Sequence, residues 1–168
     1  MEIPEDLKIP DDILARLEQP ETLRSFIEEG KSLQEIIGYT DELMEQLYKA
    51  AYEVFQEGRY KDAQDGFLFL TTLNPYVYAY WLGLAMSYQL MEEYEQAILA
   101  YECASSVESE TPLPYYYLAG CHLYLNEYDE AQESLDLLKE KCRNRPEYKE
   151  LMEKAQKAEM TIQKRKNA

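Results

Sequence analysis

The feature that most constrains this chain is a spacing of 34 residues at which several columns of similar residues recur. One column is alanine, at Ala63, Ala97 and Ala131, with a tyrosine three residues before each and a bulky apolar residue four residues after each. A second alanine column and a column of large apolar residues repeat upstream at the same spacing. The other columns are Tyr60, Tyr94 and Tyr128; Phe67, Tyr101 and Leu135; Ala51, Ala85 and Ala119; and Leu47, Trp81 and Tyr115. Columns that stay in register in this way indicate three tandem repeats.

A period of 34 residues with small and large apolar residues in fixed columns is typical of tetratricopeptide repeats, each of which is a pair of antiparallel helices. Neither helix can bury its apolar face alone, so neighbouring repeats must stack to form a continuous core. Alanine allows two helices to cross closely, and the large residues fill the space beside the crossing. We therefore predict an all-α solenoid with three tetratricopeptide-type helical hairpins within residues 41–146, at 41–74, 75–108 and 109–142. We interpret the columns themselves as packing.

Turn-forming residues lie at the expected borders. Gly58 separates the two helices of the first repeat, Asn74-Pro75 precedes the second repeat, and Pro112 and Pro114 flank the start of the third. The acidic run at residues 105–110 is interpreted as a solvated loop between repeats.

Helical segments are also predicted outside the repeats. In the N-terminal segment, residues 1–40, we expect short helices at about 11–18 and 21–29, and a capping box of Ser32 with Glu35 ahead of a third apolar stretch. Residues 1–10 are expected to be loose. In residues 147–168 we expect a polar helix up to about residue 164, which caps the last repeat, and a short tail.

Charge narrows the choice of partners. The chain has 33 acidic and 17 basic residues and a formal net charge of −16. Such a surface repels nucleic-acid backbones and anionic lipid, so we expect no nucleic-acid partner. No apolar run approaches the roughly 18 residues of a membrane span, and the acidic N-terminus lacks a secretory signal pattern. We therefore expect a cytoplasmic protein with no stable membrane insertion.

The sequence shows no pattern of a catalytic or metal site. Cys103, Cys121 and Cys142 lack CxxC spacing, which argues against a zinc site or a disulfide framework. His122 is the single histidine and has no companion for a catalytic triad, so we interpret it as a packed side chain. Six glycines form no phosphate-binding loop. We predict no catalytic residues, no metal, no cofactor and no enzymatic activity.

The candidate binding surface is the inner, concave face, which the first helix of each hairpin lines in this architecture. Residues one, five and eight positions after the column of Leu47, Trp81 and Tyr115 share one stripe. This stripe is aromatic and apolar where a solvated face would be charged, which indicates a peptide-binding groove. The alternative is that flanking helices or a dimer partner cover it. The candidate groove residues are Tyr48, Tyr52, Phe55, Leu82, Met86, Gln89, Tyr116, Tyr117 and Leu123.

The residue types on this stripe also limit the ligand. Binding of a peptide's terminal carboxylate would need Lys, Arg and Asn on the inner helices, whereas these places hold residues such as Tyr48, Tyr52, Leu82 and Met86. We therefore expect an extended segment with spaced apolar side chains and few acidic groups.

Several short segments point to a known family. They lie within residues 20–145 and consist of Gly30-Lys31-Ser32-Leu33, of Leu47-Tyr48 with Ala51-Tyr52, of Trp81-Leu82-Gly83-Leu84-Ala85 with Gln89, and of Ala119-Gly120-Cys121-His122-Leu123. On these residues the chain resembles the class II chaperones of bacterial type III secretion, of the SycD/LcrH kind. It departs from many members at Gly120, where they have an acidic residue, and in the run from Gly83 to Met86.

The resemblance implies a function. Chaperones of this kind bind hydrophobic translocator proteins in the bacterial cytoplasm and keep them soluble and ready for export. Their concave groove takes a short extended segment, and Tyr48, Tyr52 and Phe55 match its aromatic positions in the first repeat. The resemblance also implies a homodimer formed through the N-terminal helices, here about residues 11–37. Two other functions stay open: a scaffold or regulatory adaptor that binds partners through its acidic outer face, and a structural subunit of a secretion apparatus.

Overall fold

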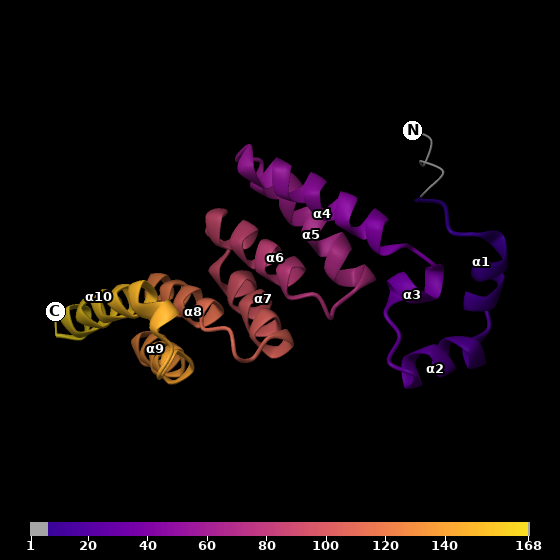
Figure 1. The fold of residues 1–168 in the computed structure, drawn as a ribbon. Coiled ribbons are helices and arrows are strands. Elements are labelled where there is room, and N and C mark those ends of the chain that lie inside the picture. Colours follow the sequence, from indigo (N-terminus) through magenta and orange to yellow (C-terminus); the bar gives the residue numbers. More distant parts are fainter. Residues whose placement is uncertain (1–6, 168) are drawn as a thin grey trace.

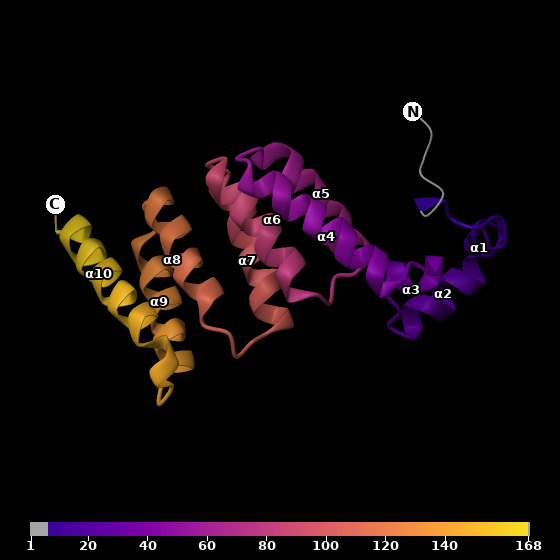
Figure 2. The ribbon, with the colours of Figure 1, turned by 45° about the horizontal axis from the view of Figure 1, so that its top comes forward.

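Three helical hairpins stacked side by side form most of the molecule (Figures 1 and 2). The structure is a computed structural model that describes residues 7–167, except for the side chains of Leu23 and Ile27. The first hairpin pairs α4 (Asp41–Gln56) with α5 (Tyr60–Leu73), and the second pairs α6 (Tyr78–Leu90) with α7 (Tyr94–Val107). The third pairs α8 (Leu113–Leu125) with α9 (Tyr128–Cys142). The described residues contain no strand, and the predicted all-α stack of three hairpins is confirmed.

The recurring columns form the core. Ala63, Ala97 and Ala131 are fully buried, and the alanines of the other column are at most 6% exposed. The large residues of the second helices are also fully buried, at Phe67, Tyr101 and Leu135. The columns therefore act as packing, as predicted.

The turn inside each hairpin repeats as well. Gly58 has a φ of +79°, in the left-handed region that suits glycine. The residues 34 and 68 positions later, Glu92 and Asn126, adopt the same region with φ values of 62° and 63°. Gly58 and Asn126 are residue types that adopt this region readily, whereas Glu92 carries no signal for a left-handed conformation.

The N-terminal helices lie at one end of the stack. They are α1 (Asp11–Leu17), α2 (Pro20–Glu28) and α3 (Leu33–Ile37). The predicted capping box is present, since the Ser32 hydroxyl accepts a hydrogen bond from the Glu35 backbone and the Glu35 carboxylate accepts one from the Ser32 backbone N–H at 2.8 Å. The expectation of a loose start is wrong for residues 7–10, because Tyr39 Oη donates to the Leu7 carbonyl at 2.6 Å and Ile9 packs against the core. Residues 1–6 lie outside the described part.

The segment between the second and third hairpins differs from the expected loop. α7 continues through Val107, so only residues from Glu108 onward leave the helix. The hydroxyls of Ser105 and Ser106 donate to the Glu102 carbonyl at 2.8 and 2.9 Å. These bonds satisfy both serine hydroxyls inside the helix, so the polar run is compatible with a helical conformation.

The C-terminal helix closes the other end of the stack. A 3₁₀ turn, Pro146–Tyr148, leads into α10 (Lys149–Lys166), which begins two residues later than expected. α10 buries Ala155 and Ile162 against a cluster that includes Leu135 and Leu138. No helix in residues 7–167 is long and apolar enough to cross a membrane.

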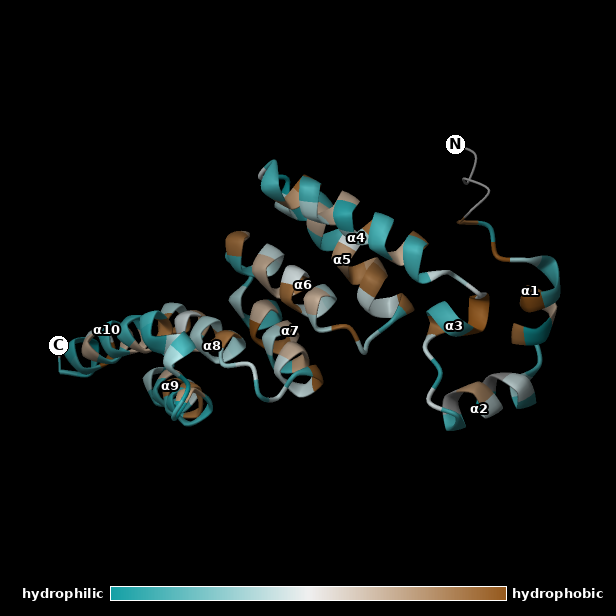
Figure 3. Cartoon of the chain, viewed as in Figure 1, coloured by the Kyte–Doolittle hydropathy of each residue, from teal (hydrophilic) through white to brown (hydrophobic). Residues whose placement is uncertain are grey.

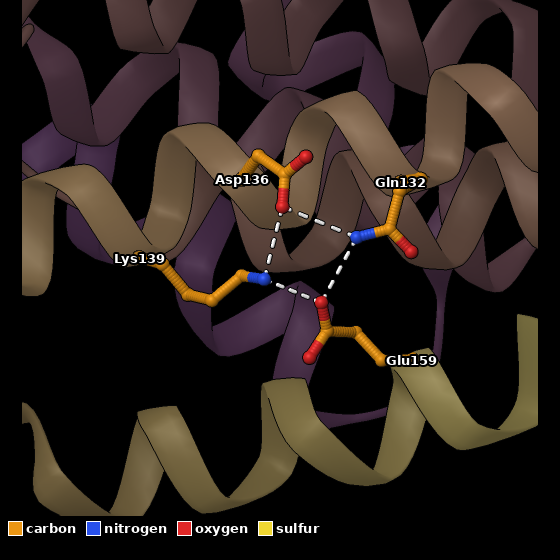
Figure 4. Close-up of polar contacts among 4 residues, drawn as sticks. All are labelled: Gln132, Asp136, Lys139 and Glu159. Carbon is orange, nitrogen blue, oxygen red and sulfur yellow. Dashed lines mark hydrogen bonds and ion pairs between the residues drawn. The ribbon is translucent and has the colours of Figure 1, made fainter.

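A polar network also joins α10 to α9 (Figure 4). Gln132 Nε2 donates to Asp136 Oδ1 at 3.1 Å and to Glu159 Oε1 at 2.9 Å. Lys139 Nζ forms ion pairs with the same two carboxylates. Apolar burial and this network of hydrogen bonds and ion pairs both hold the C-terminal helix against the last hairpin.

Candidate peptide-binding groove

Three aromatic side chains form a row along α4. Tyr48, Tyr52 and Phe55 follow one another at spacings of four and three residues, so they lie on one face of the helix. The ring centroids of Tyr48 and Tyr52 are 6.2 Å apart, and those of Tyr52 and Phe55 are 6.4 Å apart. The rings are close to parallel, with interplanar angles of 19° and 15°. This row makes a continuous apolar wall.

α6 supplies the opposite wall and α5 the floor. The hollow between them has a volume of about 60 Å³. The Phe67 ring at its base lies 6.0 Å from that of Tyr48. No charged residue lines the hollow, which is formed by Tyr48, Tyr52, Phe55, Phe67, Ala79, Leu82, Gly83 and Met86.

The middle ring of the aromatic row is the most exposed, since Tyr48 and Phe55 are half-buried and Tyr52 is exposed. Tyr48 also contacts Tyr80, and burial raises the pKa of its hydroxyl, with Tyr52 contributing in the same direction. Tyr52 is 45% exposed although it is surrounded by apolar groups. An exposed aromatic ring beside an apolar hollow forms an apolar surface, and covering that surface with a ligand is favourable in free energy.

The predicted groove residues divide into two groups. The structure brings Tyr48, Tyr52, Phe55, Leu82 and Met86 together around one hollow. The remaining four lie further along the stack and do not line it: Gln89, Tyr116, Tyr117 and Leu123.

The residues of the second group have partners within the fold. Gln89 Oε1 accepts a hydrogen bond from Tyr101 Oη at 2.6 Å, which ties α6 to α7. Tyr117 stacks on Tyr101 with ring centroids 5.3 Å apart. Tyr116 and Leu123 are half-buried and pack against the cluster that α10 helps to form. At this end the alternative considered from the sequence, cover by a flanking helix, applies in part.

Sequence reasoning missed three residues of the hollow: Phe67, Ala79 and Gly83. Phe67 belongs to a packing column, and the same ring that fills the core also floors the hollow. Ala79 lies three residues before Leu82 and therefore shares its helix face, a signal that was available in the sequence. Gly83 carried no such signal.

His122 and the two buried cysteines, Cys121 and Cys142, are structural. His122 Nδ1 lies 2.8 Å from Glu127 Oε2, and its side chain is 15% exposed. Cys121 is fully buried, and burial raises the pKa of its thiol to about 12, so it stays protonated and unreactive at neutral pH. Within the described residues no group of three or more His, Cys, Asp or Glu side chains is placed to hold a metal ion.

Known proteins share this fold and about a third of the aligned residues. No family model matches the chain. Low calcium response locus protein H of Yersinia pseudotuberculosis is 32% identical over 129 residues, which cover 77% of each chain. SycD of Yersinia enterocolitica, solved with a peptide of the translocator YopD, is 32% identical, with a TM-score of 0.72 over 76% of this chain and 97% of that one. PcrH of Pseudomonas aeruginosa, solved with the chaperone-binding region of PopD, is 29% identical, with a TM-score of 0.73 over 77% and 97%. The chain therefore belongs to the family of class II type III secretion translocator chaperones that includes protein H and SycD.

Proposed function

We propose that this chain is a chaperone that binds a hydrophobic translocator protein of a type III secretion system and keeps it soluble until export. The observation that carries the proposal is the apolar hollow between α4 and α6, with the exposed Tyr52 ring at its edge. The solved complexes of SycD with a YopD peptide and of PcrH with a PopD region support the choice of a translocator as the partner.

The dimensions of the hollow favour an extended segment over a folded partner. A volume of about 60 Å³ accepts single side chains, and the aromatic row continues along α4 as a strip. Covering an apolar side chain contributes about 1.5–3 kcal/mol, so several such contacts are needed to exceed the roughly 4–15 kcal/mol that association costs. Those same contacts would shield apolar client segments from aggregation.

The rest of the chain has supporting roles in this proposal. Residues 41–146 act as the binding unit, residues 147–168 cap it, and residues 1–40 form a separate self-association segment. Leu14 of α1 is 44% exposed and offers apolar surface for a homodimer. The protein works in the bacterial cytoplasm by holding its client, without catalysis and without a cofactor.

Co-expression with the hydrophobic translocator of its own secretion system tests the proposal. Tyr52→Ala removes an exposed ring from the hollow, and Phe69→Ala is the matched control because Phe69 is also 45% exposed but lies on α5 outside the hollow. We expect the translocator to stay soluble with the wild type and with Phe69→Ala, and to aggregate with Tyr52→Ala.

Equal solubility with both variants would contradict the groove assignment. A complex that is lost on adding salt but unaffected by Tyr52→Ala would instead favour an adaptor that binds through its acidic outer face, because salt screens exposed charges.

A further inference from the structure

The C-terminal helix has an unusual charge for this molecule. α10 carries six basic residues, Lys149, Lys154, Lys157, Lys164, Arg165 and Lys166, against the three acidic residues Glu150, Glu153 and Glu159, a formal charge of +3. Every other helix in residues 7–167 is neutral or negative, and the whole chain has a charge of −16. Hydrophilic residues dominate α10 in Figure 3.

The helix dipole accounts for only part of this charge. Lys164, Arg165 and Lys166 lie in the last turn, where cations stabilise the C-terminal end of a helix. Lys154 and Lys157 lie in the middle of the helix, beyond the reach of that effect. The helix dipole therefore does not explain the charge of these two lysines.

Contacts with α8 show which way the side of α10 that bears Lys154 and Arg165 faces. Arg165 Nη1 donates to the Leu123 carbonyl at 3.1 Å, which places the side of α10 that bears Arg165 over α8. Tyr116 packs against the buried cluster that includes Ala155, the residue next to Lys154, and Tyr117 meets the Tyr116 ring. The ion pair with Glu150 raises the pKa of Lys154, and Tyr116 and Tyr117 contribute in the same direction. Lys157 follows one helical turn after Lys154 on the same flank.

The ammonium group of Lys154 is accessible. Its ion pair with Glu150 is 2.9 Å long, and the two side chains are 51% and 81% exposed. An exposed pair of this kind contributes little to stability, so a carboxylate from a ligand can replace or share Glu150 at small cost. Lys157 has no ion pair within 4.0 Å in the described part of the chain.

The flank also adjoins aromatic surface at the third-repeat end of the inner face. Tyr116 and Tyr117 are half-buried and meet edge to face, with ring centroids 5.6 Å apart. Both were predicted as groove residues, and both lie beyond the hollow between α4 and α6. The inner face is therefore apolar at one end and combines aromatic rings with basic side chains at the other.

We propose that this basic flank of α10, Lys154 and Lys157 beside Tyr116 and Tyr117, binds acidic side chains of the same translocator segment whose apolar residues fill the hollow. The inference rests on the proposed function and adds a charge requirement to it. It revises the sequence-based expectation of a ligand with few acidic groups.

Geometry sets where the acidic residues must lie in the client. The hollow lies between α4 and α6 and the flank lies on α10, with α8 between them, so about two to three helix spacings of roughly 8–10 Å separate the two sites. An extended chain advances about 3.3 Å per residue, so the acidic residues fall roughly five to nine positions from the apolar ones. An acidic group is repelled by the rest of this surface and attracted only at α10, so the flank also fixes the direction in which the segment lies.

Binding of matched synthetic peptides tests the inference. All peptides have blocked ends and an apolar core of leucine, valine and proline. In the first pair, one peptide carries a run of aspartate after the core and its uncharged twin carries asparagine there. In the second pair the same runs precede the core. In one of the two orientations we expect the aspartate peptide to bind about two- to five-fold more tightly than its twin. That gain should vanish in Lys154→Gln.

Lys149→Gln is the matched control, because Lys149 is an exposed lysine on the same helix, and at about 100° per residue its side chain lies about 140° around the helix axis from that of Lys154. It should keep the gain, and the asparagine peptides should bind all three proteins equally. Two results would contradict the basic flank while leaving the proposed groove intact. One is equal affinity of the aspartate and asparagine peptides for the wild type. The other is tighter binding of the aspartate peptide that persists when Lys154→Gln and Lys157→Gln are combined. Failure of every peptide to bind the wild type would contradict the proposed groove as well.

Discussion

Gly83 lies directly against the ring of Phe67. A methyl group at Gly83 would come within 2.5–2.7 Å of three ring carbons of Phe67, closer than atoms in van der Waals contact can approach. Phe67 is fully buried and cannot swing away, so the absence of a side chain at Gly83 is what lets α6 pack on α5 while leaving a hollow above the ring.

Gly83→Ala should therefore destabilise the protein despite the better helix propensity of alanine. Overpacking of this kind costs about 1–3 kcal/mol, which exceeds the gain of about 1 kcal/mol from removing a glycine inside a helix. Urea unfolding measures the difference. Gly120→Ala is the control, because a methyl group there meets only Gln89 Nε2 at 3.9 Å, and it should stabilise by about 0.5–1 kcal/mol. Gly83→Ala as stable as Gly120→Ala would contradict the packing described.

Replacement by phenylalanine should change the free energy of unfolding differently at Tyr78 and at Tyr101. Tyr78 Oη is buried without a hydrogen-bond partner in the described residues, whereas Tyr101 Oη donates to Gln89. Tyr101→Phe should cost about 0.5–1.5 kcal/mol, while Tyr78→Phe should be neutral or stabilising because it removes an unsatisfied group. Thermal or urea unfolding of both variants tests this, and a larger loss for Tyr78→Phe than for Tyr101→Phe would refute it.

The buried hydroxyl and thiol groups predict loss of stability in alkali. Burial raises the pKa of Tyr78 and of Cys121 to about 12, and it raises the pKa of Tyr101 as well. Unfolded tyrosine and cysteine ionise near about 10 and 8.5, so in alkali the unfolded chain loses protons that the folded chain keeps. The free energy of unfolding should be steady below about pH 8.5 and fall as the pH rises toward 12.

Unfolding in urea at a series of alkaline pH values measures this decline. Tyr78→Phe should make it shallower, because one of the groups that lose a proton only in the unfolded chain is then gone. An unchanged slope in that variant, or no decline in the wild type between about pH 9 and 11, would count against the burial of these groups.

Much of the fold was predictable because its packing residues repeat. The alanine columns and their large neighbours are buried in each hairpin, so three copies of one pattern located six helices. Features that occur once were harder to see. The helical state of Ser105 and Ser106 depends on bonds to Glu102, and the turn at Glu92 has no residue type that announces it.

The groove was predictable where helix periodicity alone decides which side chains meet. Tyr48, Tyr52 and Phe55 share a face of α4, and Leu82 and Met86 share the facing side of α6. Periodicity gives the face of a helix but not what covers it, so cover by a flanking helix stayed an alternative until the structure placed Tyr116 and Leu123 against the cluster around α10. The bond that engages Gln89 could not be foreseen.

The docking of α10 leads to a further prediction. Ile162 is fully buried against the last hairpin, whereas Met160, two residues earlier, is 66% exposed. Ile162→Ala should cost about 2–4 kcal/mol, and Met160→Ala should change the free energy of unfolding by less than about 0.5 kcal/mol. Amide hydrogen exchange should show faster opening of α10 in Ile162→Ala. Protection of α10 that stays at the wild-type level would mean that the polar network with Glu159 holds the helix by itself.

Site-specific photo-crosslinking to the co-expressed translocator tests the central claim most directly. A benzoylphenylalanine residue in place of Tyr52 lies in the hollow, and one in place of Leu99, which is 63% exposed on α7, lies outside it. We expect a strong crosslink from position 52, mapped by mass spectrometry to an apolar segment of the translocator, and none from position 99. Crosslinking from position 99 with none from position 52 would contradict it.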